Sequence, residues 1–196
     1  MYKNQGTESM VQTPSKIITV AEFLKQPETK PASEYIEGQI IQKHNPQGKH
    51  STIQGELVTA INAILKPAKI ARAFPELRCT FEERSIVPDI SVFTWDRIPR
   101  DHNGAIANIF LIAPDWMIEI LSPDQSPTKV IKKILYCLNH QTQMAWLIDP
   151  EEQSIFVYHS QQQTEVFDQP ESLISVPQFA TDIKLTVGEL FAWLLE

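Results

Sequence analysis

Residues 116–149 contain an apolar run, an amphipathic segment and a second apolar run, and this order constrains the fold more than any other feature of the sequence. The apolar runs at 116–121 and 145–149 predict two buried strands. Between them, over residues 128–140, apolar side chains recur at helical spacing at Ile131, Ile134, Leu135 and Leu138. A helix with one apolar face buries that face against a sheet. The sequence therefore predicts a strand–helix–strand unit in which the helix packs on a sheet.

Similar patterns predict the other elements of the chain. Further strands are predicted at residues 34–42, 77–83, 86–94, 154–159 and 164–167, with the second and third of these forming an antiparallel pair. Spacings typical of a capping box predict further helices that begin near Thr19, Ser51 and Thr186. We expect an α/β or mixed α+β fold, with a central mixed β-sheet flanked by helices, in one domain over 17–196 after a flexible N-terminal tail at 1–16.

Composition narrows the class of protein. A chain of 196 residues, 42% of them hydrophobic, can bury a full core without disulfides or a structural metal. Cys79 and Cys137 have no CxxC partner, so we expect two reduced, buried thiols. The net charge of −7 argues against a strong overall attraction to nucleic acid, although a local basic patch remains compatible with it. With no signal sequence and no apolar stretch long enough to span a bilayer, a cytoplasmic protein is expected.

Two acidic residues interrupt predicted apolar strands and are the first candidates for chemistry. Asp89 follows Ile86, Val87 and Pro88, and Glu119 lies within the run 116–121. Ionised carboxylates are seldom buried unless they are paired or bind a metal, and two together repel unless a cation neutralises them. Mg²⁺ prefers one or two carboxylates, with water and phosphate as its other ligands. Alternatively, each acid lies at a strand end, faces solvent or caps a turn.

The helix predicted at 128–140 supplies candidate lysines. Lys132 could direct its ammonium group over the strand toward Glu119, where it would orient an attacking water or stabilise negative charge on a phosphate. Lys129 and Lys133 are rivals for the same position. These lysines could instead form the solvated basic face of an amphipathic helix.

Several short motifs, taken in order, resemble a known family. They are Glu34-Tyr35-Ile36-Glu37-Gly38, His50, Val87-Pro88-Asp89, Glu119-Ile120-Leu121-Ser122-Pro123, Lys132-x-x-x-Tyr136 and Trp146-Leu147-Ile148-Asp149-Pro150. Over roughly residues 30–160 the chain resembles the PD-(D/E)-x-K restriction-endonuclease-like superfamily. Within it, the chain is similar to the Uma-type family of predicted restriction endonucleases, formerly a domain of unknown function. The superfamily's usual lysine position is Leu121 in this chain, which departs from the pattern.

The resemblance implies a site and a set of roles. Asp89 and Glu119 would bind Mg²⁺ or Mn²⁺ with the backbone carbonyl of Ile120 as a further ligand, and Lys132 would take the role of the missing strand lysine. His50 would contact a phosphate or deliver a proton, or would instead orient the preceding loop through a hydrogen bond. Glu56 would be an accessory acidic group, or a solvated residue outside the apolar stripe of its helix.

The expected function is a metal-dependent endonuclease that hydrolyses phosphodiester bonds of DNA. Because cutting both strands of a duplex calls for two such sites, a homodimer is a reasonable hypothesis. One alternative is a catalytically silent nuclease-fold module that binds nucleic acid or protein, which the acidic composition and Leu121 favour. Another is a structural or interaction domain in which Asp89 and Glu119 make ordinary polar contacts.

Overall fold

The computed structural model describes residues 18–123, 125–161 and 163–195, so the tail predicted at 1–16 lies outside the described residues. Its larger sheet has six strands, in the order β10-β9-β8-β7-β6-β3. The β7 and β8 strands are parallel and every other neighbouring pair is antiparallel, so the sheet is mixed. In chain order these strands are β3 (Ala71–Pro75), β6 (Ile90–Thr94), β7 (Trp116–Ile120), β8 (Met144–Asp149), β9 (Ser154–His159) and β10 (Glu165–Phe167).

A smaller antiparallel sheet has four strands, in the order β2-β1-β5-β4. Its strands are β1 (Ser33–Ile36), β2 (Gln39–Gln42), β4 (Cys79–Phe81) and β5 (Arg84–Ile86). The β1–β2 connection turns at Glu37 and Gly38, whose φ angles are 51° and 80°. Both residues adopt the left-handed conformation that two-residue hairpin turns require.

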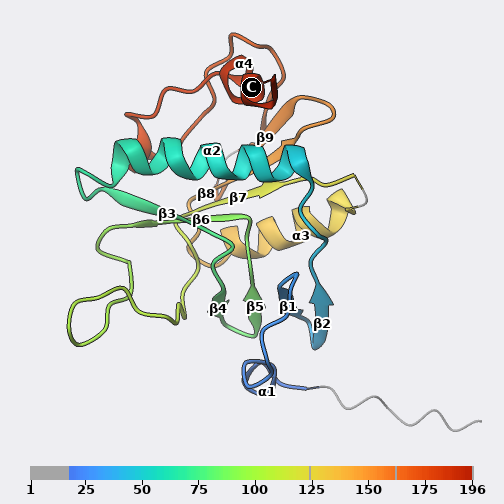
Figure 1. The fold of residues 1–196 in the computed structure, drawn as a ribbon, viewed down its shortest axis with the longest axis vertical. Coiled ribbons are helices and arrows are strands. Elements are labelled where there is room, and N and C mark those ends of the chain that lie inside the picture. The colour runs from blue at the N-terminus through green and yellow to red at the C-terminus, as the bar shows by residue number, and fades with distance from the viewer. Residues whose placement is uncertain (1–17, 124, 162, 196) are drawn as a thin grey trace, which may run out of the picture.

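The two longest helices cover opposite faces of the six-stranded sheet (Figure 1). The helices of the described chain are α1 (Val20–Phe23), α2 (Gly48–Leu65), α3 (Pro127–Leu138) and α4 (Val187–Ala192), with short 3₁₀ turns at Gln178–Ala180 and Trp193–Leu195. Helix α2 packs with Trp116 and Ile118 of β7, whereas α3 packs with Met117. Alternate residues of a strand point to opposite faces, so these contacts place one helix on each side.

The fold class predicted from the sequence is confirmed, because helices flank a central mixed sheet. The strand–helix–strand unit is β7, α3 and β8. Capping boxes are present at Thr19 with Glu22 and at Thr186 with Glu189. Cys79 and Cys137 are free and buried, as predicted.

Three local predictions were wrong. Residues 34–42 form the β1–β2 hairpin rather than one strand, because Gly38 allows the chain to reverse. The strands predicted at 77–83 and 86–94 pair with each other only where Cys79 lies opposite Ile86. Instead, β4 pairs with β5, and β6 joins the larger sheet between β3 and β7. Pro88, which has no backbone N–H to donate to a ladder, separates β5 from β6.

The third wrong prediction is the start of α2, which begins at Gly48 rather than near Ser51. Its N-cap residue, Gln47, makes no side-chain capping hydrogen bond. Gln54, the other half of the predicted capping box, donates from Nε2 to the backbone carbonyl of Asp89, at 2.7 Å. A tertiary contact therefore replaces the local one that its spacing predicted.

Candidate functional site

Asp89 lies just before β6, where the chain leaves the small sheet and enters the larger one, and it is 2% exposed. Its Oδ2 accepts from the backbone N–H of Ile120 at 2.8 Å and lies 3.1 Å from His50 Nε2. Its Oδ1 accepts from Lys43 Nζ at 2.7 Å. Burial by itself raises the pKa of Asp89, but the Lys43 ammonium and then His50 outweigh it and hold the pKa far below its usual range. Asp89 is therefore an ionised carboxylate inside the protein.

Glu119 lies within β7, on the face of the sheet that α3 covers, and is 1% exposed. Lys133 Nζ lies 2.9 Å from its Oε1. Its Oε2 is buried without a hydrogen-bond partner among the described residues. Burial raises the pKa of Glu119 to about 7; the Lys133 ammonium opposes this rise and the Asp89 carboxylate adds to it. A buried carboxylate oxygen without a partner is uncommon, and it has the chemistry to bind a cation.

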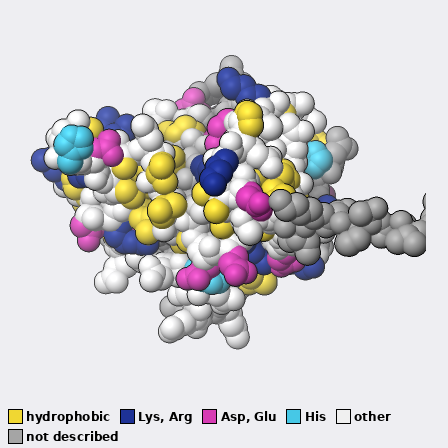
Figure 2. Space-filling view, turned by 90° about the horizontal axis from the view of Figure 1, so that it is seen from below, with side chains coloured by type: hydrophobic (Ala, Val, Ile, Leu, Met, Phe, Trp, Pro, Cys, Tyr) yellow, Lys and Arg dark blue, Asp and Glu magenta, His cyan; other side chains and the backbone are white. Residues whose placement is uncertain are grey.

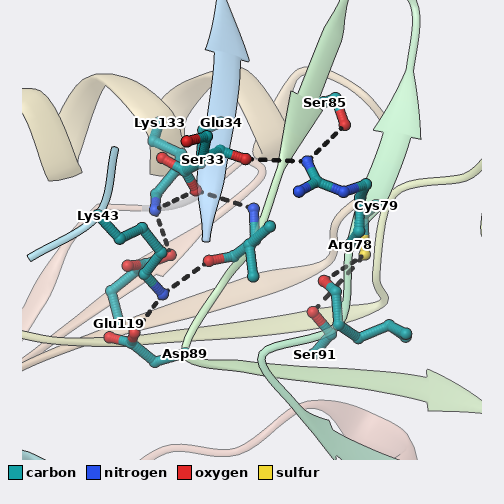
Figure 3. A network of polar contacts seen from close by, with 12 residues as sticks. Ser33, Glu34, Lys43, Arg78, Cys79, Ser85, Asp89, Ser91, Glu119 and Lys133 are labelled. Carbon is teal, nitrogen blue, oxygen red and sulfur yellow. Dashed lines mark hydrogen bonds and ion pairs between the residues drawn. The ribbon is translucent and has the colours of Figure 1, made fainter. Parts of the chain in front are cut away.

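Lys133 connects Glu119 to a third buried acid, Glu34 of β1. Its Nζ lies 3.0 Å from Glu34 Oε1, which also accepts from the backbone N–H of Val87 at 2.8 Å. Figure 3 shows Lys133 and Lys43 directed into the same cluster of acidic side chains. Burial lowers the pKa of Lys133, but the nearby carboxylates of Glu119 and Glu34 outweigh it and raise the pKa above its ordinary value. Lys133 is therefore a buried ammonium held between two acids.

Lys132 does not reach the carboxylates, since the structure leaves it exposed and places its neighbour Lys133 at that position. The cause is the rotation of α3 about its axis. The residues that α3 buries are Val130, Lys133, Ile134, Cys137 and Leu138, whereas Leu135 of the predicted stripe is 48% exposed. Val130 and Cys137 are also apolar and lie at helical spacing from Ile134. They define a second possible apolar face of the helix, and this face includes Lys133. That alternative stripe is the sequence signal that could have identified Lys133.

The other predicted residues have different locations. His50, in the first turn of α2, contacts Asp89, so it is brought into the cluster. Glu56, two turns further along α2, is exposed and lies outside it. Ile120 is positioned beside Asp89 by its own backbone N–H. Sequence reasoning missed Lys43, because no apolar or helical pattern surrounds it.

The cluster formed by these side chains combines three carboxylates, from Glu34, Asp89 and Glu119, with two ammonium groups, from Lys43 and Lys133. Within the described residues no three His, Cys, Asp or Glu side chains are arranged to hold a metal ion. A metal site here would thus depend on Asp89 and Glu119 with backbone oxygen, water or phosphate as other ligands, an arrangement that Mg²⁺ accepts.

Comparison with known proteins assigns the chain to a family. The family model described as "Putative restriction endonuclease", Uma2, matches residues 20–188. The chain is also similar to a crystal structure from Anabaena variabilis ATCC 29413, described as "a putative nuclease belonging to DUF820". The identity is 68%, the match covers 90% of this chain and 99% of the other, and the TM-score is 0.89.

A search of curated proteins finds no match. Among the described residues, no helix combines the length and the apolar character needed to cross a membrane. The fold, the order of the motifs and the family match over most of the chain agree, and the protein belongs to the Uma2 restriction-endonuclease-like family.

Proposed function

We propose that the protein is a divalent-metal-dependent endonuclease that hydrolyses phosphodiester bonds of DNA. The observation that carries this proposal is the pair of buried acids, Asp89 and Glu119. Asp89 accepts a hydrogen bond from the backbone N–H of Ile120, the residue that follows Glu119 in β7. The unpartnered Oε2 of Glu119 fits a cation at this position. The family match and the related nuclease structure support a nuclease on independent grounds.

Asp89, Glu119 and the backbone carbonyl of Ile120 would hold Mg²⁺ or Mn²⁺. Such an ion, when bound, neutralises phosphate charge and lowers the pKa of a water ligand. The side chains around it position the two acids before any substrate arrives. The Ile120 N–H and His50 fix Asp89.

On the other side of the cluster, Lys133 holds Glu119 by an ion pair. We propose that Lys133, rather than Lys132, has the role of the superfamily lysine. Direct attack of water on phosphorus needs no covalent enzyme intermediate, and no nucleophilic side chain is required.

Contact with DNA would be local rather than spread over a broad basic surface. Figure 2 shows one face of the molecule, that of α1 and the small sheet, where described Lys, Arg, Asp and Glu side chains are interspersed with hydrophobic ones. A net charge of −7 also limits long-range attraction to DNA. Because few phosphate contacts would hold the complex, DNA binding should be weak and should fall only gradually as salt is added.

Cleavage of supercoiled plasmid and of single-stranded DNA with Mg²⁺, Mn²⁺ or EDTA tests the proposal. We expect metal-dependent nicking that Asp89→Asn and Glu119→Gln abolish. Glu56→Gln is the matched control, because it removes one acidic charge from an exposed position on α2. Absence of cleavage by the folded parent with either metal would refute the nuclease proposal and favour a silent module.

The lysine assignment has its own matched pair of variants. Lys133→Met should lose nicking activity while Lys132→Met retains it, since only Lys133 contacts Glu119. The opposite result would refute the assignment. Lys133→Met must first be shown to be folded by circular dichroism.

We also propose a homodimer, because two sites are needed to cut both strands of a duplex. Linear product formed directly from supercoiled plasmid, together with a dimer in sedimentation equilibrium, is the expected result. A monomer that only nicks would contradict it.

A further inference from the structure

Lys43 binds the same carboxylate that is proposed to hold the metal. It directly follows β2, its side chain is 11% exposed, and its Nζ donates to Asp89 Oδ1 at 2.7 Å and to the Val87 carbonyl at 2.8 Å. Lys43 also lines a small surface pocket over Asp89. The other residues around this pocket are His44, Pro46, His50, Glu76, Ser122 and Gln125. Lys43 therefore has access both to the buried acid and to the surface.

The contacts of Asp89 leave one oxygen on which a cation and Lys43 would compete. Oδ2 is already occupied by the Ile120 N–H and by His50. For Oδ1, the partner that the described residues provide is Lys43. A divalent ion shared by Asp89 and Glu119 would place two positive charges next to the Lys43 ammonium, and like charges at contact distance repel. Since both would face the same carboxylate oxygen, the cation and the Lys43 ammonium weaken each other's binding to Oδ1.

Lys133 is differently placed, although it is also a lysine in the cluster. It is held between Glu34 and Glu119 and does not line the surface pocket. A cation that bound Glu119 through its unpartnered Oε2 would leave the ion pair between Lys133 and Oε1 in place. Of the two lysines, Lys43 is the one that a metal would displace and that a substrate phosphate could then reach.

We propose that Lys43 competes with the divalent cation for Asp89 Oδ1, and that its displaced ammonium binds a phosphate of the nucleic acid at the mouth of the pocket. The inference rests on the proposed function, and it deepens it by coupling the two binding events. Metal binding releases Lys43 for the substrate, and the substrate phosphate supplies the anion that offsets the two neighbouring cations. By linkage, metal and DNA strengthen each other's binding in the parent protein.

The first test measures Mn²⁺ affinity by isothermal titration calorimetry without DNA. Lys43→Met should bind Mn²⁺ at least about tenfold more tightly than the parent, because a repelling charge at contact distance is gone. Lys49→Met is the matched control: it removes the same charge from a side chain that is 53% exposed and paired with Glu151. It should change the affinity less than about threefold, because solvent and salt screen an exposed charge.

The second test measures binding of a nuclease-resistant phosphorothioate duplex by fluorescence anisotropy, in Mn²⁺ and in EDTA. Mn²⁺ should strengthen duplex binding by the parent and by Lys49→Met, but much less by Lys43→Met. If Lys43→Met does not fold, Mn²⁺ affinity and duplex binding are measured instead on Lys43→Gln, which keeps a polar side chain.

The outcomes separate the two proposals. Equal Mn²⁺ affinity of the parent and the Lys43 variants would overturn this inference and leave the metal site standing. Absence of Mn²⁺ binding by every folded variant would overturn both. Equal enhancement of duplex binding by Mn²⁺ in Lys43→Met and the parent would overturn the phosphate role of Lys43.

Discussion

Replacing Lys133 by Met should destabilise the protein more than any other single loss of a lysine on α3. Met keeps the length of the side chain and a similar helix propensity, so the change removes mainly the charge. The Lys133 ammonium is 6% exposed and lies 3.0 Å from Glu34 Oε1 and 2.9 Å from Glu119 Oε1. Without it, both buried carboxylates lose their nearest cation. Removing one partner of a buried ion pair costs about 3–5 kcal/mol of unfolding free energy.

Urea unfolding in EDTA at pH 8, followed by tryptophan fluorescence that includes Trp116 and Trp146, measures this loss. Both indoles are fully buried, so unfolding changes their environment. At this pH Glu119 is ionised, because its pKa is about 7. Lys132→Met is the control, and as an exposed residue it should change the free energy by less than about 0.5 kcal/mol.

A second comparison isolates the electrostatic cause of the effect. In a background with Glu34→Gln and Glu119→Gln, adding Lys133→Met should cost much less, because no buried charge is left without a partner. The reasoning is refuted if Lys133→Met and Lys132→Met are equally stable. It is also refuted if the cost is the same in the Gln background, because packing rather than charge would then explain it.

Three further predictions concern pH, thiol reactivity and the β1–β2 turn. Because burial raises the pKa of Glu119 from 4.5 to about 7, the unfolded chain ionises first, so the parent should lose stability in EDTA from about pH 4.5 to 7. Glu119→Gln should flatten this part of the urea-unfolding pH profile, and an unchanged slope would contradict the prediction. Burial raises the pKa of Cys79 to about 12 and that of Cys137 even further, so a thiol reagent should label native protein far more slowly than protein in urea. Rapid native labelling would contradict this burial. Gly38→Ala places a Cβ at a φ of 80° and should cost about 1 kcal/mol in the same unfolding assay, whereas unchanged stability would show that the turn tolerates it.

The elements that sequence predicted correctly depend on contacts between near neighbours. The Thr19 and Thr186 capping boxes formed because each needs only a partner three residues away. The Ser51–Gln54 spacing has the same local signal, but Gln54 donates instead to the carbonyl of Asp89, 35 residues further on. A local pattern therefore predicts structure only where no distant group competes for the same side chain.

Local patterns also predicted some residues of the candidate site, whereas residues placed by distant contacts were missed. Asp89 and Glu119 stand out as charges within apolar strands, and the structure buries both. The motif that includes His50 predicts an accessory role for it, but its contact with Asp89 does not follow from its position in the chain. Glu34 lies in a short motif that assigns it no role, yet it shares Lys133 with Glu119 from a strand in the other sheet. Lys43 has no surrounding pattern, and its contact with Asp89 spans 46 residues.

The sequence by itself determined the mixed fold class, the strand–helix–strand unit and the two acidic residues that interrupt apolar strands. Each of these follows from periodicity, which is a property of residues close together in the chain. Only the tertiary structure decided that Lys133, and not Lys132, meets Glu119. Adjacent residues of a helix point about 100° apart, so the choice depends on how α3 is rotated against the sheet. That rotation is set by the packing of Val130, Ile134 and Cys137 against side chains from distant strands, which no local pattern specifies.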